Sequence, residues 1–290
     1  MSSSELYSIG GTAIVIKGGD RSSLTSSNIC AVNNKIHNYA TIKKTYHPGI
    51  SLAGVGNCAK NNEIYNAPHF GIFFTGNNHN IEYNDIHHVV KQSNDAGAIY
   101  AGRDWSSRGN VIKYNFLHDI TGLNNKGAKG VYLDDEFSGV TIYGNIFENV
   151  HDAVFIGGGR DNIVDNNLFI NSEPSIHIDT RGTGWAKGQI SQLMSKLNKV
   201  PYESNLWKEQ YPNIGEALTV NTRLPVGNVI KQNAFFDKKW NGIYSEAKQY
   251  VILKDNHFFV NEKPTLDYQL ESKVNGFQSI PFKRIGIQAH

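Results

Sequence analysis

Tyr83-Asn84-Asp85-Ile86 is one of eight similar segments in this chain of 290 residues. The other seven are Val32-Asn33-Asn34-Lys35-Ile36, Asn61-Asn62-Glu63-Ile64, Tyr114-Asn115-Phe116-Leu117, Gly144-Asn145-Ile146-Phe147, Asn166-Asn167-Leu168-Phe169, Gln232-Asn233-Ala234-Phe235 and Asp255-Asn256-His257-Phe258. When the shared Asn is numbered zero, positions −3 and +2 are apolar in every copy, whereas position −2 is charged in most of them. This alternation predicts a half-buried strand, a turn at the Asn and a second strand.

The spacing of these segments predicts the fold. Successive shared Asn residues are 28, 22, 31, 30, 22, 66 and 23 residues apart, and no helical periodicity or leucine ladder accompanies them. A repeat with a fixed minimum and tolerated insertions is typical of a solenoid whose loops vary in length. Asn suits the turn, because it tolerates the left-handed region and its amide can bond the same amide in the next coil. We therefore expect an all-β fold, a right-handed parallel β-helix, with residues 1–290 in one domain.

The composition argues against several kinds of partner. Lys and Arg number 28 against 26 Asp and Glu, so no strong field attracts nucleic acid or an anionic membrane. No apolar run approaches the roughly 20 residues that span a bilayer. The opening residues, Met1 to Glu5, have neither a basic nor an apolar region, so we expect no signal peptide in the chain as given.

Two sets of residues share a position in successive coils. Cys30 and Cys58 both occupy position −4, which should place their Cα atoms about 4.8 Å apart. A disulfide and two stacked free thiols both fit that distance. His37, His87 and His118 share position +3, and we interpret them as a surface or turn ladder rather than a metal site. The sequence predicts no metal and no cofactor.

One long segment, at about 181–227, departs from the repeat. Within it Ile190, Leu193, Met194 and Leu197 have helical spacing, which predicts a short amphipathic helix. A loop this long between coils is uncommon unless it covers something.

A further strand can be aligned in five coils, and its outward side carries the candidate chemistry. Ile72, Ile99, Val131, Val154 and Ile176 should point inward by alternation. The outward positions form an aromatic row, Phe73, Tyr100, Tyr132, Phe155 and His177, followed by the row Thr75, Gly102, Asp134, Gly157 and Asp179. Just past the strand ends come Arg103, Asp104, Asp135, Arg160 and Arg181.

Such a surface suits a carbohydrate, because aromatic rings contact the apolar face of a sugar while Asp and Arg bind its hydroxyls. Gly102 and Gly157 should leave a hollow where a ligand approaches the backbone. The Cα atoms of Asp134 and Asp179, two coils apart, should lie about 10 Å apart. Carboxyl groups roughly 6.5–9.5 Å apart suit inverting hydrolysis, with one as acid and the other as base. The alternative is that these aspartates only cap turns; Asp135 should face the opposite way from Asp134 unless the strand has ended.

The ordered motifs also resemble a known family. They are Gly11-Thr12-Ala13-Ile14, Gly19-Asp20-Arg21, Pro68-His69-Phe70-Gly71-Ile72, Asp95-Ala96-Gly97-Ala98-Ile99-Tyr100-Ala101-Gly102-Arg103-Asp104-Trp105, Val131-Tyr132-Leu133-Asp134-Asp135, Phe155-Ile156-Gly157-Gly158-Gly159-Arg160-Asp161, His177-Ile178-Asp179-Thr180-Arg181-Gly182 and Pro281-Phe282-Lys283-Arg284-Ile285-Gly286-Ile287. Together they resemble the right-handed β-helix proteins around glycoside hydrolase family 141, which act on α-L-fucosides and on xylan through two aspartates. The resemblance implies a secreted protein and a catalytic pair drawn from Asp95 and either Asp134 or Asp135. Members of that family carry a long stretch before the part matching Gly11, so the resemblance also implies an N-terminally shortened chain.

The leading hypothesis is a glycoside hydrolase that acts on a polysaccharide or oligosaccharide. Asp134 would be the acid or base, with Asp95 or Asp179 as its partner and Asp135 as a further candidate. The proposed substrate-binding residues are His69, Tyr100, Arg103, Asp104, Tyr132, Arg160, His177 and Arg181. Two alternatives stay open: a polysaccharide lyase with a Lys, Arg or His base, and a non-catalytic carbohydrate-binding or structural solenoid.

Overall fold

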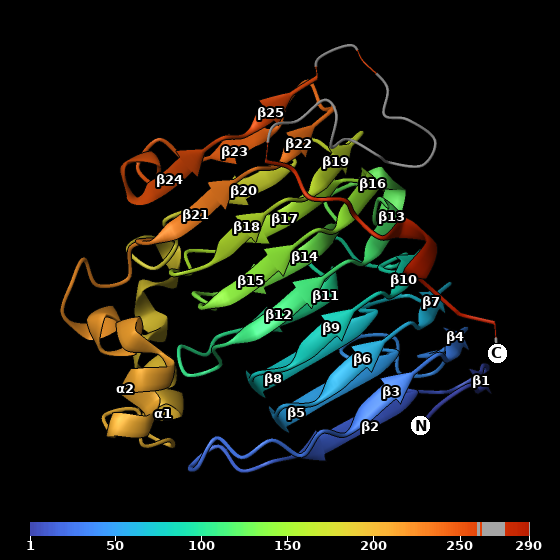
Figure 1. Cartoon of the computed structure of the whole chain (residues 1–290), viewed down its shortest axis with the longest axis horizontal. Helices are drawn as coiled ribbons and strands as arrows, with labels where there is room; N and C mark the ends of the chain where they lie inside the picture. Colours follow the sequence, from blue (N-terminus) through green and yellow to red (C-terminus); the bar gives the residue numbers. More distant parts are fainter. Residues whose placement is uncertain (260–261, 263–275, 290) are drawn as a thin grey trace.

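The chain winds into a right-handed parallel β-helix, as predicted (Figure 1). The computed structural model describes residues 1–259, 262 and 276–289. Coils from β2 onward contribute one strand to each of three parallel sheets, and each strand pairs with its counterpart in the next coil. Short strands and in-register stacking follow from a repeat in which the same positions are apolar in every coil.

Sheet 1 carries the row of aromatic and acidic residues. Its strands are β2 (Ile14–Gly18), β5 (Ile50–Val55), β8 (Ile72–Asn77), β11 (Gly97–Gly102), β14 (Lys129–Asp134), β17 (Asp152–Ile156), β20 (Ile176–Ile178) and β23 (Asn241–Ile243).

Sheets 2 and 3 flank the Asn turn. Sheet 2, before the turn, contains β3 (Cys30–Val32), β6 (Cys58–Lys60), β9 (Asn80–Glu82), β12 (Asn110–Lys113), β15 (Val140–Tyr143), β18 (Ile163–Asp165), β21 (Asn228–Lys231) and β24 (Val251–Lys254). Sheet 3, after it, contains β1 (Glu5–Leu6), β4 (Lys35–His37), β7 (Glu63–Tyr65), β10 (Asp85–His87), β13 (Phe116–Ile120), β16 (Ile146–Val150), β19 (Leu168–Ile170), β22 (Ala234–Phe235) and β25 (His257–Phe258).

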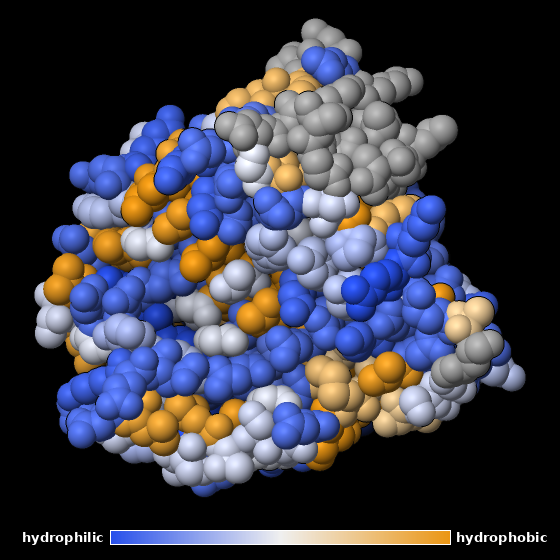
Figure 2. Space-filling model, in the orientation of Figure 1, coloured by the Kyte–Doolittle hydropathy of each residue, from blue (hydrophilic) through white to orange (hydrophobic). Residues whose placement is uncertain are grey.

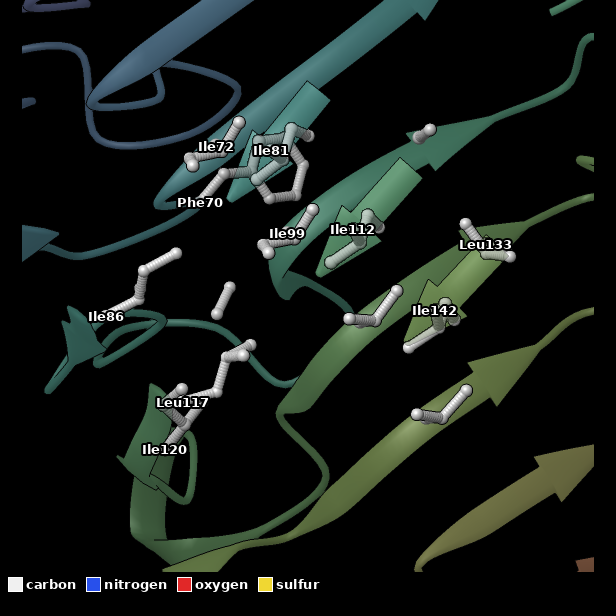
Figure 3. Packing of buried hydrophobic residues seen from close by; sticks show 14 of the residues in the cluster. Phe70, Ile72, Ile81, Ile86, Ile99, Ile112, Leu117, Ile120, Leu133 and Ile142 are labelled. Atoms are coloured by element: carbon white, nitrogen blue, oxygen red, sulfur yellow. The ribbon is translucent and has the colours of Figure 1, made fainter. Parts of the chain in front are cut away.

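The interior is filled by the apolar positions of the repeat. Side chains from all three sheets, among them Ile72, Ile81 and Ile86, point into one core (Figure 3). Positions −3 and +2 are fully buried except in the last of the eight copies, where Leu253 is 50% exposed and Phe258 48% exposed. The outer face in view is mainly hydrophilic, with small groups of hydrophobic side chains (Figure 2). The predicted alternation is therefore confirmed for the stacked coils.

The shared Asn residues form a continuous buried ladder. Asn84 donates from its backbone N–H and from Nδ2 to Asn115 Oδ1, both at 2.9 Å, and Nδ2 also donates to the carbonyl of Ala59 at 2.9 Å. The same side-chain contact recurs from Asn34 to Asn256. Each amide thus satisfies backbone groups of the neighbouring coils that would otherwise be buried without partners.

The predicted reason for Asn at the turn is only half correct. The left-handed residue of the turn is position −1, not the shared Asn itself. These residues are Asn33, Asn61, Tyr83, Tyr114, Gly144, Asn166, Gln232 and Asp255, with φ between 50° and 62°. Position zero is Asn because its amide bonds the neighbouring coils. The left-handed backbone conformation is required at position −1 instead, where the side chain varies.

Cys30 and Cys58 form a disulfide between β3 and β6, which decides between the two alternatives left open by the sequence. Their Cα atoms are 4.5 Å apart, close to the separation expected for equivalent positions in adjacent coils.

The long departure from the repeat follows β20 and contains the expected helix. It comprises a 3₁₀ helix (Trp185–Gln189), α1 (Ile190–Leu197), α2 (Asn205–Gln210) and a second 3₁₀ helix (Pro212–Leu218). Leu193, Leu197 and Trp207 pack with Trp105 in a small core of their own, and the Trp207 indole donates to the carbonyl of Arg21 at 3.1 Å. The segment therefore reaches from the coil of β20 back to the coil of β2, along the turns that follow sheet 1 (Figure 1).

Residues 276–289 also run back across the coils. Asn166 binds Gln278 through both its oxygen and its nitrogen, at 2.7 and 2.9 Å, and Asn33 binds Gln288 in the same way, at 2.8 and 3.2 Å. This C-terminal segment includes a 3₁₀ helix (Phe282–Arg284), and two further 3₁₀ helices lie at Leu123–Asn125 and Lys248–Tyr250. No helix in the described part of the chain has the length and apolar character of a membrane span.

We predict that Asn115→Ala lowers the free energy of unfolding by about 1–3 kcal/mol, because it leaves buried donors of Asn84 without an acceptor. Urea denaturation measures the change. Asn80→Ala is the matched control, since that Asn lies in β9 with its side chain exposed, and it should change stability by less than about 0.5 kcal/mol. Equal effects of the two substitutions would contradict a stabilising role of the ladder.

Candidate functional site

The outward side of sheet 1 carries a continuous row of aromatic rings, as the alignment predicted. Tyr100, Tyr132, Phe155 and His177 pair in register across four strands. The ring centroids of successive members are 5.4, 4.9 and 3.8 Å apart. Since the register of the strands fixes these spacings, the row is as rigid as the sheet beneath it.

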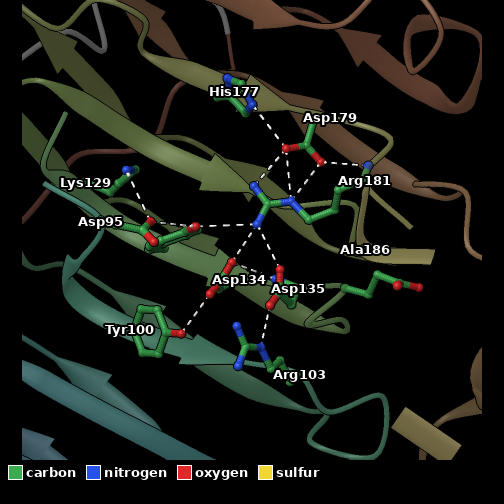
Figure 4. A network of polar contacts seen from close by, with 12 residues as sticks. Asp95, Tyr100, Arg103, Lys129, Asp134, Asp135, His177, Asp179, Arg181 and Ala186 are labelled. Carbon is green, nitrogen blue, oxygen red and sulfur yellow. Dashed lines mark hydrogen bonds and ion pairs between the residues drawn. The ribbon is translucent and has the colours of Figure 1, made fainter. Parts of the chain in front are cut away.

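Beside this row, one guanidinium joins three carboxylates (Figure 4). Arg181 Nη1 donates to Asp134 Oδ1 at 2.6 Å and to Asp135 Oδ1 at 3.1 Å. Its Nε and Nη2 donate to Asp179 Oδ2 at 3.0 and 2.8 Å. All four side chains are buried, so each charge depends on the others for compensation. We call these four residues the acid cluster.

The hollow expected at the two glycines is occupied by the protein itself. A Cβ atom on Gly157 would lie 2.5 Å from Arg181 Cζ, and one on Gly102 would lie 3.1 Å from the Tyr100 hydroxyl. Gly157 therefore makes room for the guanidinium between Asp134 and Asp179. At Gly157 the expectation that a ligand reaches the backbone is wrong, because alternation along a strand does not reveal a side chain that folds back from the following loop.

Asp135 joins the cluster because β14 ends at Asp134. Its φ of 40° takes it out of strand geometry, and it lies on the same side as Asp134, the exception that the sequence analysis allowed. Arg103, whose side chain is 46% exposed, donates to Asp135 Oδ2.

The surroundings push the pKa values of Asp134 and Asp179 in opposite directions. Burial and the nearby charge of Asp135 raise the pKa of Asp134, although it accepts a hydrogen bond from the Tyr100 hydroxyl at 2.8 Å. Burial acts in the same direction on Asp179, but His177 Nε2 at 3.5 Å and the bonds from Arg181 outweigh it and lower the pKa. The cluster therefore combines a carboxyl group that favours a proton with one held ionised.

Asp95 precedes β11, contacts the aromatic row at Tyr132 and is open to solvent. Its side chain is 85% exposed, and its Oδ1 accepts a hydrogen bond from the Tyr132 hydroxyl at 3.2 Å. The same hydroxyl lies 3.4 Å from Arg181 Nη1, so Tyr132 links Asp95 to the acid cluster.

Lys129 is a member of this site that the sequence analysis missed. Its Nζ donates to the carbonyl of Asn94 at 2.9 Å, lies 3.8 Å from Asp95 Oδ1, and sits over the rings of Tyr132 and Phe155 at 5.1 and 5.3 Å. Burial lowers its pKa. Lys129 has the same strand parity as inward-pointing Val131, so alternation places it in the core; a lysine at such a position was the signal that could have found it.

His69 lies beside the aromatic row. Its ring is 4.0 Å from Phe70 and 5.3 Å from Tyr46, between centroids. Burial lowers its pKa to about 4, so it is neutral at pH 7. It neighbours the site without contacting the acid cluster through any hydrogen bond that the described residues show.

Two predicted substrate-binding residues have structural roles instead. Asp104 accepts hydrogen bonds from the backbone and hydroxyl of Ser106 and from the hydroxyl of Ser107, so it caps its own turn. Arg160 is buried beneath the long segment after β20 and donates to the carbonyls of Glu216 and Val220 at 3.3 and 3.0 Å. The sequence placed both just past strand ends but could not show that a segment from a later coil covers that edge.

Comparison with known proteins bears on the fold of this region. A family model described as right handed beta helix region matches residues 1–186 of the chain. The match covers the strands from β1 to β20 and every member of the acid cluster. No curated protein matches the chain.

We predict that Arg181→Gln lowers the free energy of unfolding by roughly 3–5 kcal/mol at pH 7, because it leaves buried carboxylates uncompensated. The loss should shrink at about pH 4, since without the guanidinium the carboxyl pKa values rise and protonation relieves the repulsion. Denaturation at both pH values measures this. Arg103→Gln, which removes one half-exposed partner of Asp135, should cost about 1 kcal/mol or less; a loss for Arg181→Gln that is independent of pH would contradict the charge argument.

Proposed function

The chain belongs to the right-handed β-helix family, and from the site on sheet 1 we propose that it is a glycoside hydrolase acting on a polysaccharide or oligosaccharide. The observation that carries the proposal is the buried carboxyl of Asp134, whose raised pKa suits a proton donor, beside a row of aromatic rings. The fold hosts several chemistries, so the argument rests on the site rather than on the β-helix itself.

Asp134 is the proposed general acid. A glycosidic oxygen leaves only when it receives a proton, and the burial that raises the pKa of Asp134 favours the protonated form that can donate it. The Tyr100 hydroxyl and Arg181 hold the two oxygens of Asp134 in fixed positions. These partners restrict rotation of the Asp134 carboxyl, and a fixed orientation favours proton transfer to a substrate held in one position.

Asp95 is the proposed partner carboxylate. Asp179 accepts three hydrogen bonds from the Arg181 side chain and one from its backbone N–H, which suits positioning rather than reaction with water. Asp95 is exposed, and the contacts that link it to Asp134 through Tyr132 and Arg181 measure 3.2, 3.4 and 2.6 Å. Because these contacts share atoms, Asp95 Oδ1 and Asp134 Oδ1 cannot be farther apart than the three lengths laid end to end. That upper limit falls within the roughly 6.5–9.5 Å that separates carboxyl groups in inverting glycosidases.

The substrate class follows from the aromatic row and from the sequence resemblance. Tyr100, Phe155 and His177 are partly exposed and offer ring surfaces for sugar rings, and Arg103 offers a half-exposed donor beside them. The motifs that resemble glycoside hydrolase family 141 direct attention to α-L-fucosides and xylan-type chains. The resemblance implies a pair drawn from Asp95 and either Asp134 or Asp135, and the proposed pair is one of these two.

We predict that Asp134→Asn lowers turnover of the best substrate in a panel of fucosides and xylan oligosaccharides at least about 100-fold, since an amide cannot donate the proton. The wild type should lose activity as the pH rises through the raised pKa of Asp134, and the residual activity of the variant should lack this limb. Release of reducing ends and a pH–rate profile measure both effects.

Asp165→Asn is the matched control. That Asp lies in β18 on sheet 2, where burial also raises its pKa and Lys231 is its partner, so turnover should be unchanged. Full activity of Asp134→Asn, or glycan binding by the wild type without any product across the panel, would overturn the hydrolase proposal.

A polysaccharide lyase is the second candidate, and Lys129 is the observation that favours it. A lysine whose pKa is lowered by burial can act as the base that abstracts a proton from an acidic sugar. Incubation with uronic-acid polysaccharides would then produce unsaturated ends that absorb in the ultraviolet. Lys129→Met should abolish that signal, whereas a hydrolase releases reducing ends without it.

A further inference from the structure

The outward face of sheet 3 carries a second stack of aromatic and histidine rings, separate from the row on sheet 1. Tyr7, His37, Tyr65, His87 and His118 occupy equivalent positions in successive coils, with centroids 5.6, 4.8, 4.9 and 4.7 Å apart. The expected histidine ladder is therefore confirmed. Two of its histidines, His87 and His118, stand in adjacent coils and are paired in register between β10 and β13.

We propose that Asp85, His87 and His118 bind a divalent transition-metal ion such as Zn²⁺, which revises the interpretation of these histidines as a ladder alone. One ligand atom from each residue lies within 4.8 Å of the other two. His118 Nε2 and Asp85 Oδ1 are 3.1 Å apart. Zinc bonds of 2.0–2.1 Å in tetrahedral geometry place ligand atoms roughly 3.3–3.5 Å apart, so this pair is nearly at coordination distance.

The remaining ring nitrogens already have partners of the kind that orient metal ligands. His118 Nδ1 is 2.8 Å from Asp119 Oδ2, an arrangement that places the proton on Nδ1 and leaves the Nε2 lone pair toward Asp85. His87 Nδ1 is 2.8 Å from His88 Nδ1. In both histidines Nδ1 has a partner, and Nε2 is therefore the nitrogen that would bind the metal. His87 Nε2 lies 3.8 Å from Glu63 Oε1.

An ion at this position is accessible from solvent yet held by the fold. The side chains of Asp85, His87 and His118 are 29%, 17% and 19% exposed, so water can complete the coordination. Two ligands come from β10 and one from β13, so the ion would join two adjacent coils. His37, in the same stack, has tyrosine rings on both sides and so lacks a second imidazole, which makes it a natural control.

The test is calorimetric titration with Zn²⁺ of the full chain, purified without a polyhistidine tag, supported by the visible absorption of bound Co²⁺. We expect one ion per chain. His87→Gln, His118→Gln and Asp85→Asn should each weaken binding more than about 10-fold, and Asp119→Ala, which removes the partner of His118 Nδ1, should weaken it roughly 10-fold. His37→Gln should bind as the wild type does.

Circular dichroism of each variant establishes that a loss of binding is not a loss of fold. Saturating Zn²⁺ should also raise the melting temperature of the wild type and of His37→Gln, but not that of His118→Gln. Absence of stoichiometric binding by the wild type, or equal weakening by His37→Gln and His118→Gln, would overturn the proposal. The site lies on sheet 3, so Asp134→Asn should leave Zn²⁺ affinity unchanged.

Discussion

The buried column of asparagine amides is the constraint on which this molecule depends. Each amide accepts from the backbone and side chain of the equivalent Asn in the preceding coil, so a coil shifted by one residue would leave several buried polar groups unpaired. Hydrophobic packing acts in the same direction, because a shift of one residue would turn the inward Ile and Phe side chains outward. The ladder therefore fixes which residues stand above one another on every sheet, including Asp134 and Asp179.

The fold was predictable because the features that determine it recur at fixed positions. Two apolar columns and one Asn per coil are enough to predict the solenoid, the inward side chains and the aromatic row. The sequence did not predict which of Asn33 and Asn34 has the left-handed backbone and which forms the amide ladder. Both are asparagine, and sequence alone does not separate the two roles. A second buried polar ladder, from Asn57 through His79 and Asn110, escaped notice because His replaces Asn within it.

Only the site residues that lie within regular strands were predictable from the sequence. Alternation places Tyr100, Tyr132 and Asp134 on one face correctly, and their contacts follow from register. Arg181 reaches back from beyond a strand end to occupy the space above Gly157, and Lys129 leaves the parity of its strand. Such placements depend on loop conformation, which has no period. Their result is that one guanidinium serves three acids unequally and leaves Asp134 as the carboxyl with the raised pKa.

The C-terminal segment has a consequence for how the solenoid comes apart. In a linear array whose repeats contact only their neighbours, the end units can open one at a time. Residues 276–289 bond to the turn at Asn166 and to the turn at Asn33, so opening of the first coil also breaks its bonds to a segment that is held by a late coil. These contacts join an early coil of the stack to a late one in addition to the contacts between neighbouring coils. Proteolytic cleavage within residues 276–289 would remove this connection, and the terminal coils would then unfold separately from the rest of the stack.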